Sequence, residues 1–167
     1  MPLGQGYPQQ DCAIARALEV VGDRWTMLVL RDCFFGVHRF ADLVARLDVP
    51  RAVLADRLAR LVAAGLLRQD DGSYRVCEAA YPLWPALRAL AAFGEAAQRD
   101  AGGTVRRFAH AACGTDTATD GSCPTCGTVP APFDLVVRPL EGPDEARRDD
   151  PVSVALRAPH RLLTPLP

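Results

Sequence analysis

Apolar residues recur with helical spacing along most of the first hundred residues, which predicts a series of amphipathic helices. The predicted helices cover about residues 11–21, 23–35, 39–47 and 50–64. Gly22, Gly36 and Gly65 follow the first, second and fourth of these segments, where glycine commonly ends a helix. Pro50 has the backbone conformation that suits the first turn of the fourth helix.

A β-hairpin and a long helix are predicted next. Residues 66–69 and 74–77 flank Asp-Asp-Gly-Ser, and Asp-Gly between two alternating segments is a strong hairpin signal. A helix over about residues 81–98 follows. Its predicted inward face consists of Leu83, Leu87, Leu90 and Phe93 or Gly94. Trp84 and several alanines form a further apolar face, and such an excess is typical of a helical dimer interface.

The character of the chain changes after residue 107. Residues 108–138 are expected to form a small Cys/His ribbon-like unit followed by a strand, because small polar residues, glycines and cysteines precede an apolar stretch. Pro, Asp and Arg dominate residues 139–167, so an irregular tail is expected there. Residues 1–10 are rich in Pro, Gly and Gln and are predicted to be a flexible arm. Residues 11–107 then form one mainly α-helical domain.

Composition excludes several classes of protein. With 49% hydrophobic residues, the chain of 167 residues is globular rather than disordered. No run of eighteen apolar residues and no secretory signal are visible, so a cytoplasmic protein without a membrane partner is expected.

The charge is close to neutral, but it is distributed unevenly. All 19 basic residues are arginines, against 20 acidic residues, which gives a net charge of −1. Residues 1–107 hold 14 arginines and 12 acidic residues (+2), whereas residues 108–167 hold 5 and 8 (−3). The planar guanidinium group suits phosphate and guanine, so the position of the arginines matters more than the total charge.

The order of helices and hairpin is that of a winged helix-turn-helix. In that arrangement the helix over about 50–64 lies in the major groove of DNA, and the wing over about 66–77 lies near the backbone or minor groove. The candidate DNA-contacting residues are Arg39, Arg51, Ala52, Ala55, Asp56, Arg60 and Arg75. The alternative for Arg51, Arg60 and Arg75 is a solvated surface charge. For Arg39 it is a helix cap or an ion pair within the domain, and for Arg57, beside the buried stripe, a salt bridge to the helix over 39–47.

Five segments carry a resemblance to one family: CAIARALEVVGDRWTMLVLR (12–31), HRFADL (38–43), VLADRL (53–58), GLL (65–67) and YRVC (74–77). In this order they resemble the HxlR-type transcriptional regulators of the MarR-like winged-helix superfamily, over about residues 10–97. The resemblance implies a dimeric bacterial repressor or activator whose first and last helices pair the two subunits. Two departures are a shorter wing and the presence of Cys77 and Ala80 where the family usually has Thr and Gly.

Four residues of the C-terminal part, one histidine and three cysteines, are spaced like the ligands of a metal ion. His110 and Cys113 form one pair with two intervening residues, and Cys123 and Cys126 form another, which lets each pair close on one tetrahedral ion. The sequence therefore predicts a structural zinc site of the Cys₃His type. The alternatives are a reversible Cys123–Cys126 disulfide or a metal-free loop.

Cys12 lies at the start of the first predicted helix, where the helix dipole favours a thiolate. Some members of the family that this chain resembles use a thiol near this position to sense oxidants or electrophiles. The alternative is a small structural residue under the dimer interface. Cys33 and Cys77 lie in apolar runs and are expected to be inert.

The leading hypothesis is a homodimeric DNA-binding regulator that a small molecule or an oxidant controls. One alternative is a winged-helix and zinc-ribbon module that binds protein without sequence-specific DNA binding. An enzyme is not expected, because a thiol- or zinc-dependent mechanism needs a base near the thiol or an open metal position.

Overall fold

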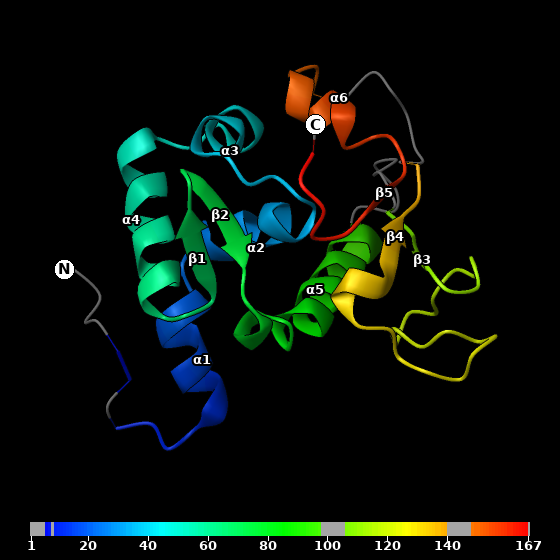
Figure 1. Cartoon of the computed structure of the whole chain (residues 1–167). Helices are drawn as coiled ribbons and strands as arrows, with labels where there is room; N and C mark the ends of the chain where they lie inside the picture. Colours follow the sequence, from blue (N-terminus) through cyan, green and yellow to red (C-terminus); the bar gives the residue numbers. More distant parts are fainter. Residues whose placement is uncertain (1–5, 8, 98–105, 140–147, 167) are drawn as a thin grey trace.

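The structure is a computed structural model that describes residues 6–7, 9–97, 106–139 and 148–166 (Figure 1). The predicted helices and hairpin are confirmed. The elements of this part are α1 (Ala13–Val21), α2 (Thr26–Phe34), α3 (Phe40–Leu47), α4 (Arg51–Ala63), β1 (Leu67–Asp70), β2 (Ser73–Val76) and α5 (Leu83–Ala97). The two strands pair antiparallel, with Leu67 opposite Val76 and Asp70 opposite Ser73. The fold is therefore a mainly helical winged helix-turn-helix.

Helix α2 is the centre of the hydrophobic core. Its Val29, Leu30 and Phe34 are fully buried, and the helix packs against both α3 and α4. Asp23 fixes the start of α2, because its carboxylate accepts hydrogen bonds from the backbone N–H groups of Trp25 (2.9 Å) and Thr26 (3.1 Å).

The C-terminal part forms a second, three-stranded antiparallel sheet (Figure 1). Its strands are β3 (Phe108–His110), β4 (Leu135–Val137) and β5 (His160–Arg161), in the order β3-β4-β5. A short helix, α6 (Pro151–Ala155), packs against α3. Phe108, Leu135 and Val137 belong to the same buried core as the helices, so the C-terminal part shares the core of the helix-turn-helix.

The expectation of an irregular tail over 139–167 is wrong for residues 148–166. Leu156 and Leu162 are each 1% exposed and belong to the core. Asp150 caps α6 by accepting a hydrogen bond from the Ser153 N–H at 2.9 Å. Average composition misled the prediction, because a few well-spaced apolar residues in a stretch rich in Pro and Arg are enough to anchor it. Residues 140–147 lie outside the described residues.

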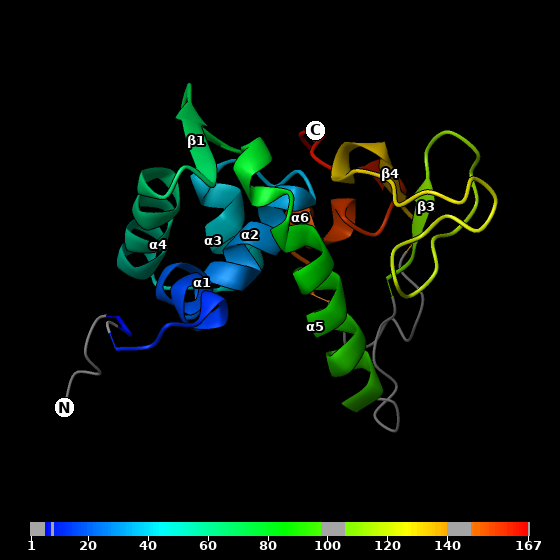
Figure 2. The same ribbon diagram turned by 90° about the horizontal axis from the view of Figure 1, so that it is seen from below.

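The prediction for the inward face of α5 is partly wrong. Trp84, which was expected on the outer face, is buried and packs against the rings of Phe34 and Phe108, with centroid distances of 5.3 and 5.0 Å. Leu90 and Phe93, which were expected inside, are 55% and 75% exposed. The reason is that the C-terminal part supplies Phe108 to cover the tryptophan, and α5 extends beyond the body of the molecule (Figure 2).

None of the described helices combines the length and the apolar character that crossing a membrane requires.

Candidate functional site

The turn between α3 and α4 sets the direction of α4. Asp48 ends α3 in the left-handed backbone conformation, with φ of 51°. Val49 is buried and anchors the turn, and Pro50 precedes the first helical residue of α4. Leu54, Leu58 and Leu61 then face the core. The opposite face of α4 is therefore left for solvent or a partner.

The predicted contact residues of α4 lie together on its exposed face. Arg51, Ala52, Ala55, Asp56 and Arg60 are all exposed. The Arg51 guanidinium lies over the ring of Phe40, 4.9 Å from its centroid, which holds the charge near the start of α4.

Arg57 makes an ion pair within the domain, but with Asp23 before α2 and not with α3, the helix to which its alternative role assigned it. Its Nε lies 2.9 Å from Asp23 Oδ1, and its Nη1 lies 2.6 Å from Asp56 Oδ2. Burial raises the pKa of Asp23, but hydrogen bonds from Thr26 and Trp25 and the Arg57 charge outweigh it, so the pKa is lowered. Arg57 thus links α4 to the capped start of α2, and it also engages the Asp56 carboxylate.

The wing places two positive charges opposite each other. Arg68 of β1 is the direct cross-strand partner of Arg75 of β2, and like charges in this position destabilise a strand pair. Arg39 is exposed and forms an isolated bridge with Ser73, and the Tyr74 N–H donates to the His38 carbonyl at 2.7 Å. The wing is therefore fixed to the segment that leads into α3, and its arginines form a basic edge.

The four predicted metal ligands come together. One donor atom from each of His110, Cys113, Cys123 and Cys126 lies within 4.8 Å of the others. The Cys113 and Cys123 sulfurs are 3.4 Å apart, and the Cys113 sulfur is 3.7 Å from His110 Nδ1. A tetrahedral zinc ion with Zn–S bonds of about 2.3 Å keeps its sulfur ligands about 3.8 Å apart. The cluster can therefore hold a metal ion such as zinc.

The two halves of the cluster have the same backbone geometry. The N–H of Gly114 donates to the His110 carbonyl, and the N–H of Gly127 donates to the Cys123 carbonyl, both at 2.8 Å. Both glycines have positive φ, 72° and 66°, a conformation that glycine adopts without strain. Each pair of ligands thus lies on a tight turn that directs both side chains toward one point.

Within the cluster, the pKa values of the Cys113 and Cys126 thiols are shifted in opposite directions. Hydrogen bonding from Thr115 lowers the pKa of Cys113 to about 6. The pKa of Cys126 is raised to about 11, chiefly because the Cys126 thiol contacts that of Cys113. A bound cation stabilises all three thiolates. The structure holds these cysteines as free thiols.

The remaining cysteines differ in exposure. Cys12 directly precedes α1, where the sequence placed it, and its side chain is exposed. Cys33 is buried, and burial, together with the nearby Asp32 charge, raises the pKa of its thiol, so it is unreactive. Cys77 is partly buried.

Sequence reasoning missed a buried charge in α2. Asp32 is fully buried, and the Arg31 guanidinium pairs with it at 2.8 Å. An acidic residue inside the apolar run of α2 was the available signal, because a carboxylate is rarely fully buried without a partner.

Comparison with known proteins identifies relatives of this chain. A model of the HxlR-like helix-turn-helix family matches residues 20–100. The uncharacterized HTH-type transcriptional regulator Rv3095 of Mycobacterium tuberculosis is 36% identical over 122 residues, which cover 69% of this chain and 77% of that protein. The corresponding protein Mb3122 of Mycobacterium bovis gives the same values. The chain is also similar to PA1607, a candidate transcription factor with a crystal structure, at 35% sequence identity. The match covers 53% of this chain and 66% of the PA1607 chain, with a TM-score of 0.49.

Proposed function

The chain belongs to the HxlR-like helix-turn-helix family, and on this basis we propose that it is a DNA-binding transcriptional regulator. The observation that carries the proposal is the exposed face of α4, which bears Arg51 and Arg60 opposite the buried leucine stripe. The wing adds the facing pair Arg68 and Arg75. These basic groups lie on α4 and the adjacent hairpin, at one end of the molecule (Figure 1).

In this proposal α4 is the recognition helix and enters the major groove. Ala52 and Ala55 are small, so they let the helix approach the edges of the bases closely. Arg51, in the first turn, reaches a base or phosphate, and Arg60 binds the backbone. The family membership and the open face of α4 support this arrangement.

The wing contacts the DNA backbone or the minor groove. Arg68 and Arg75 repel each other in the free protein, and a phosphate between them relieves that repulsion. Arg39 extends the same basic edge from the segment beside β2.

We further propose that the regulator is a homodimer that pairs through α1 and α5. Ile14 of α1 is 70% exposed and Phe93 of α5 is 75% exposed, with Leu18 and Leu90 also exposed. Large apolar side chains exposed on two helices are costly in water, and their burial between two subunits would remove that cost. Two-fold pairing presents the two α4 helices to half-sites about one helical turn apart.

The metal of the Cys/His cluster is proposed to be structural zinc. Four protein ligands leave no open position for a substrate, so the ion stabilises the turns and does not catalyse a reaction. It supplies a positive charge that holds the three thiols as thiolates. We also propose that an oxidant acting at Cys12, or a small molecule, controls DNA binding by the regulator.

The DNA-binding prediction is tested with Arg51→Ala, Arg60→Ala and Arg75→Ala. Each substitution is expected to weaken binding to the DNA upstream of the protein's own gene by about tenfold, because each removes one charge-assisted contact. Each lost phosphate contact also lowers the slope of log affinity against log salt by about 1. Fluorescence anisotropy titrations at several salt concentrations measure both effects.

Arg161→Ala is the matched control, since Arg161 lies on β5, across the molecule from α4 (Figure 1). Unchanged affinity and salt slope in the triple variant of Arg51, Arg60 and Arg75 would contradict DNA binding and favour a protein-interaction module.

The dimer prediction is tested with Phe93→Glu. A charge at this exposed position is expected to dissociate the dimer, raising its dissociation constant at least tenfold, because the carboxylate must be desolvated in the interface. Sedimentation velocity over a concentration series measures the change. Val129→Glu, at a residue 68% exposed near the Cys/His cluster, is the control. A monomeric wild-type chain, or a Phe93 variant as dimeric as the control, would overturn the prediction.

The zinc prediction is tested by elemental analysis of protein purified without added metal. About one zinc ion per chain is expected, and Cys126→Ser is expected to lose most of it and to unfold at a lower temperature. Cys12→Ser removes an exposed thiol outside the cluster and is expected to keep the full zinc content. Less than one ion per two wild-type chains would argue against the site.

A further inference from the structure

A cavity of about 540 Å³ lies between α2, α5 and the C-terminal segments. Its volume is in the range of small-molecule sites. One side is apolar, with Trp84, Leu87 and Phe108 among its lining residues. The other lining residues include arginines, which come from α2, α3, α5, the segment before β3 and the segments that flank α6.

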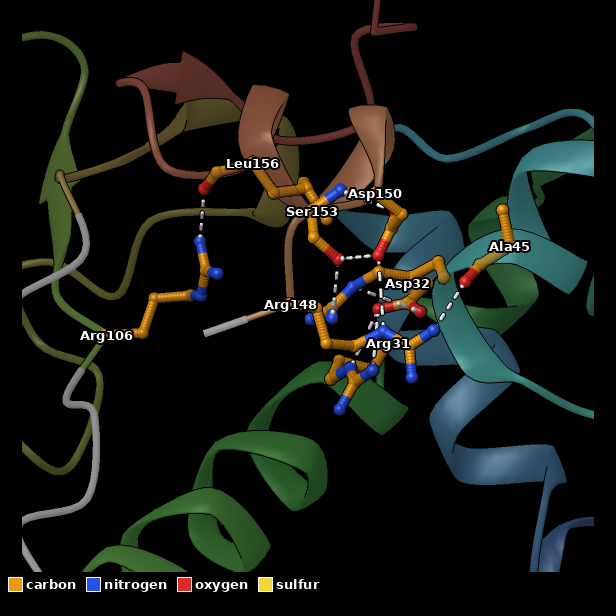
Figure 3. A network of polar contacts seen from close by, with 9 residues as sticks. Arg31, Asp32, Ala45, Arg106, Arg148, Asp150, Ser153 and Leu156 are labelled. Carbon is orange, nitrogen blue, oxygen red and sulfur yellow. Dashed lines mark hydrogen bonds and ion pairs between the residues drawn. The ribbon is translucent and has the colours of Figure 1, made fainter. Parts of the chain in front are cut away.

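Arginine is the predominant charged residue of the lining. Among the described residues, a single carboxylate, Glu95, lines the cavity, together with Arg31, Arg46, Arg88, Arg106, Arg148 and Arg157. Figure 3 shows several of these arginines around Asp32, above α5. Arg148 has its own partner in Asp150, at 3.2 Å. The cavity therefore concentrates positive charge in a partly enclosed space.

The buried carboxylate of Asp32 does not neutralise its neighbours. Arg31 Nη2 lies 2.8 Å from one Asp32 oxygen, and Arg46 Nε lies 3.9 Å from the other. One negative charge is thus shared between two guanidinium groups. In the described part of the chain, Arg46 Nε and Asp32 Oδ2 are both buried without a hydrogen bond, which is costly.

The guanidinium of Arg106 has uncharged partners, whereas the backbone N–H of this residue donates to Glu95 Oε1 at 3.5 Å. It donates to the Leu156 carbonyl at 2.9 Å and lies over the ring of Phe35, 4.8 Å from its centroid. Burial lowers the pKa of Arg106 to about 10, and the charges of Arg46 and Arg31 act in the same direction. The structure thus holds a mostly buried cation among other cations, an arrangement that an anion would stabilise.

The apolar side complements this charge. The rings of Trp84 and Phe108 meet edge to face, with centroids 5.0 Å apart. The indole N–H of Trp84 is also buried and has no partner among the described residues. Flat apolar walls beside donors, with few acceptors, suit a ligand that has an apolar ring system and an acidic group.

We infer that this cavity binds an organic carboxylate with an aromatic body, whose acidic group lies among Arg31, Arg46 and Arg106 and whose ring lies against Trp84. The site is separate from α4 and the wing, so the inference does not depend on DNA binding. It assigns a role to the C-terminal part, which supplies Arg106, Phe108 and the arginines around α6.

The test uses isothermal titration calorimetry of the full chain with 2-naphthoate, and with 2-naphthylmethanol as the uncharged analogue. Naphthoate is expected to bind one molecule per chain with a dissociation constant below about 1 mM, and the alcohol at least tenfold more weakly. Arg106→Gln and Arg46→Gln are each expected to weaken naphthoate binding at least tenfold. Arg161→Gln, outside the cavity, is expected to leave it unchanged.

A second pair of variants avoids the buried arginines, whose loss could unfold the protein. Ala91 and Ala92 are neighbouring exposed residues of α5, and of the two only Ala91 lines the cavity. Ala91→Phe is therefore expected to block binding, while Ala92→Phe retains it. No heat with naphthoate at millimolar concentration, equal binding of the alcohol, or equal binding by the two phenylalanine variants would each overturn the inference.

Discussion

Trp84 lies between two phenylalanines that are far apart in the sequence, Phe34 at the end of α2 and Phe108 at the start of β3. Aromatic contacts of this size contribute strongly to a core, through both buried area and ring geometry. Because the tryptophan is on α5, the contact joins the central helix, the last helix of the helix-turn-helix and the C-terminal sheet. Leu156 and Leu162 of the C-terminal part belong to the same core.

Two consequences follow for the surface of the molecule. With Trp84 turned inward, Leu90 and Phe93 of α5 point outward, and this is the apolar surface that the proposed dimer uses. The same contact forms one wall of the arginine-lined cavity. The proposed dimer interface and the proposed ligand site therefore share one helix, α5.

Local patterns in the sequence predicted the helices, the hairpin and the Cys/His cluster. Helical spacing identified α4 by its leucine stripe, Asp-Gly identified the hairpin, and the paired spacing of His110 to Cys126 anticipated a cluster that the fold closes. These signals depend on neighbours within a few residues. The orientation of α5 could not be predicted in this way, because it depends on Phe108, which lies 24 residues after Trp84. The cavity was missed for the same reason, since its arginines are scattered from Arg31 to Arg157.

The most direct test of DNA regulation by this chain is a footprint of the purified protein on the DNA upstream of its own gene and of the neighbouring genes. The account predicts two protected half-sites whose centres are about one helical turn, or 10–10.5 base pairs, apart, or a multiple of that spacing. Protection is expected to persist in excess nonspecific DNA. The absence of any protected segment, or protection that nonspecific DNA removes completely, would contradict the claim that this chain is a sequence-specific regulator.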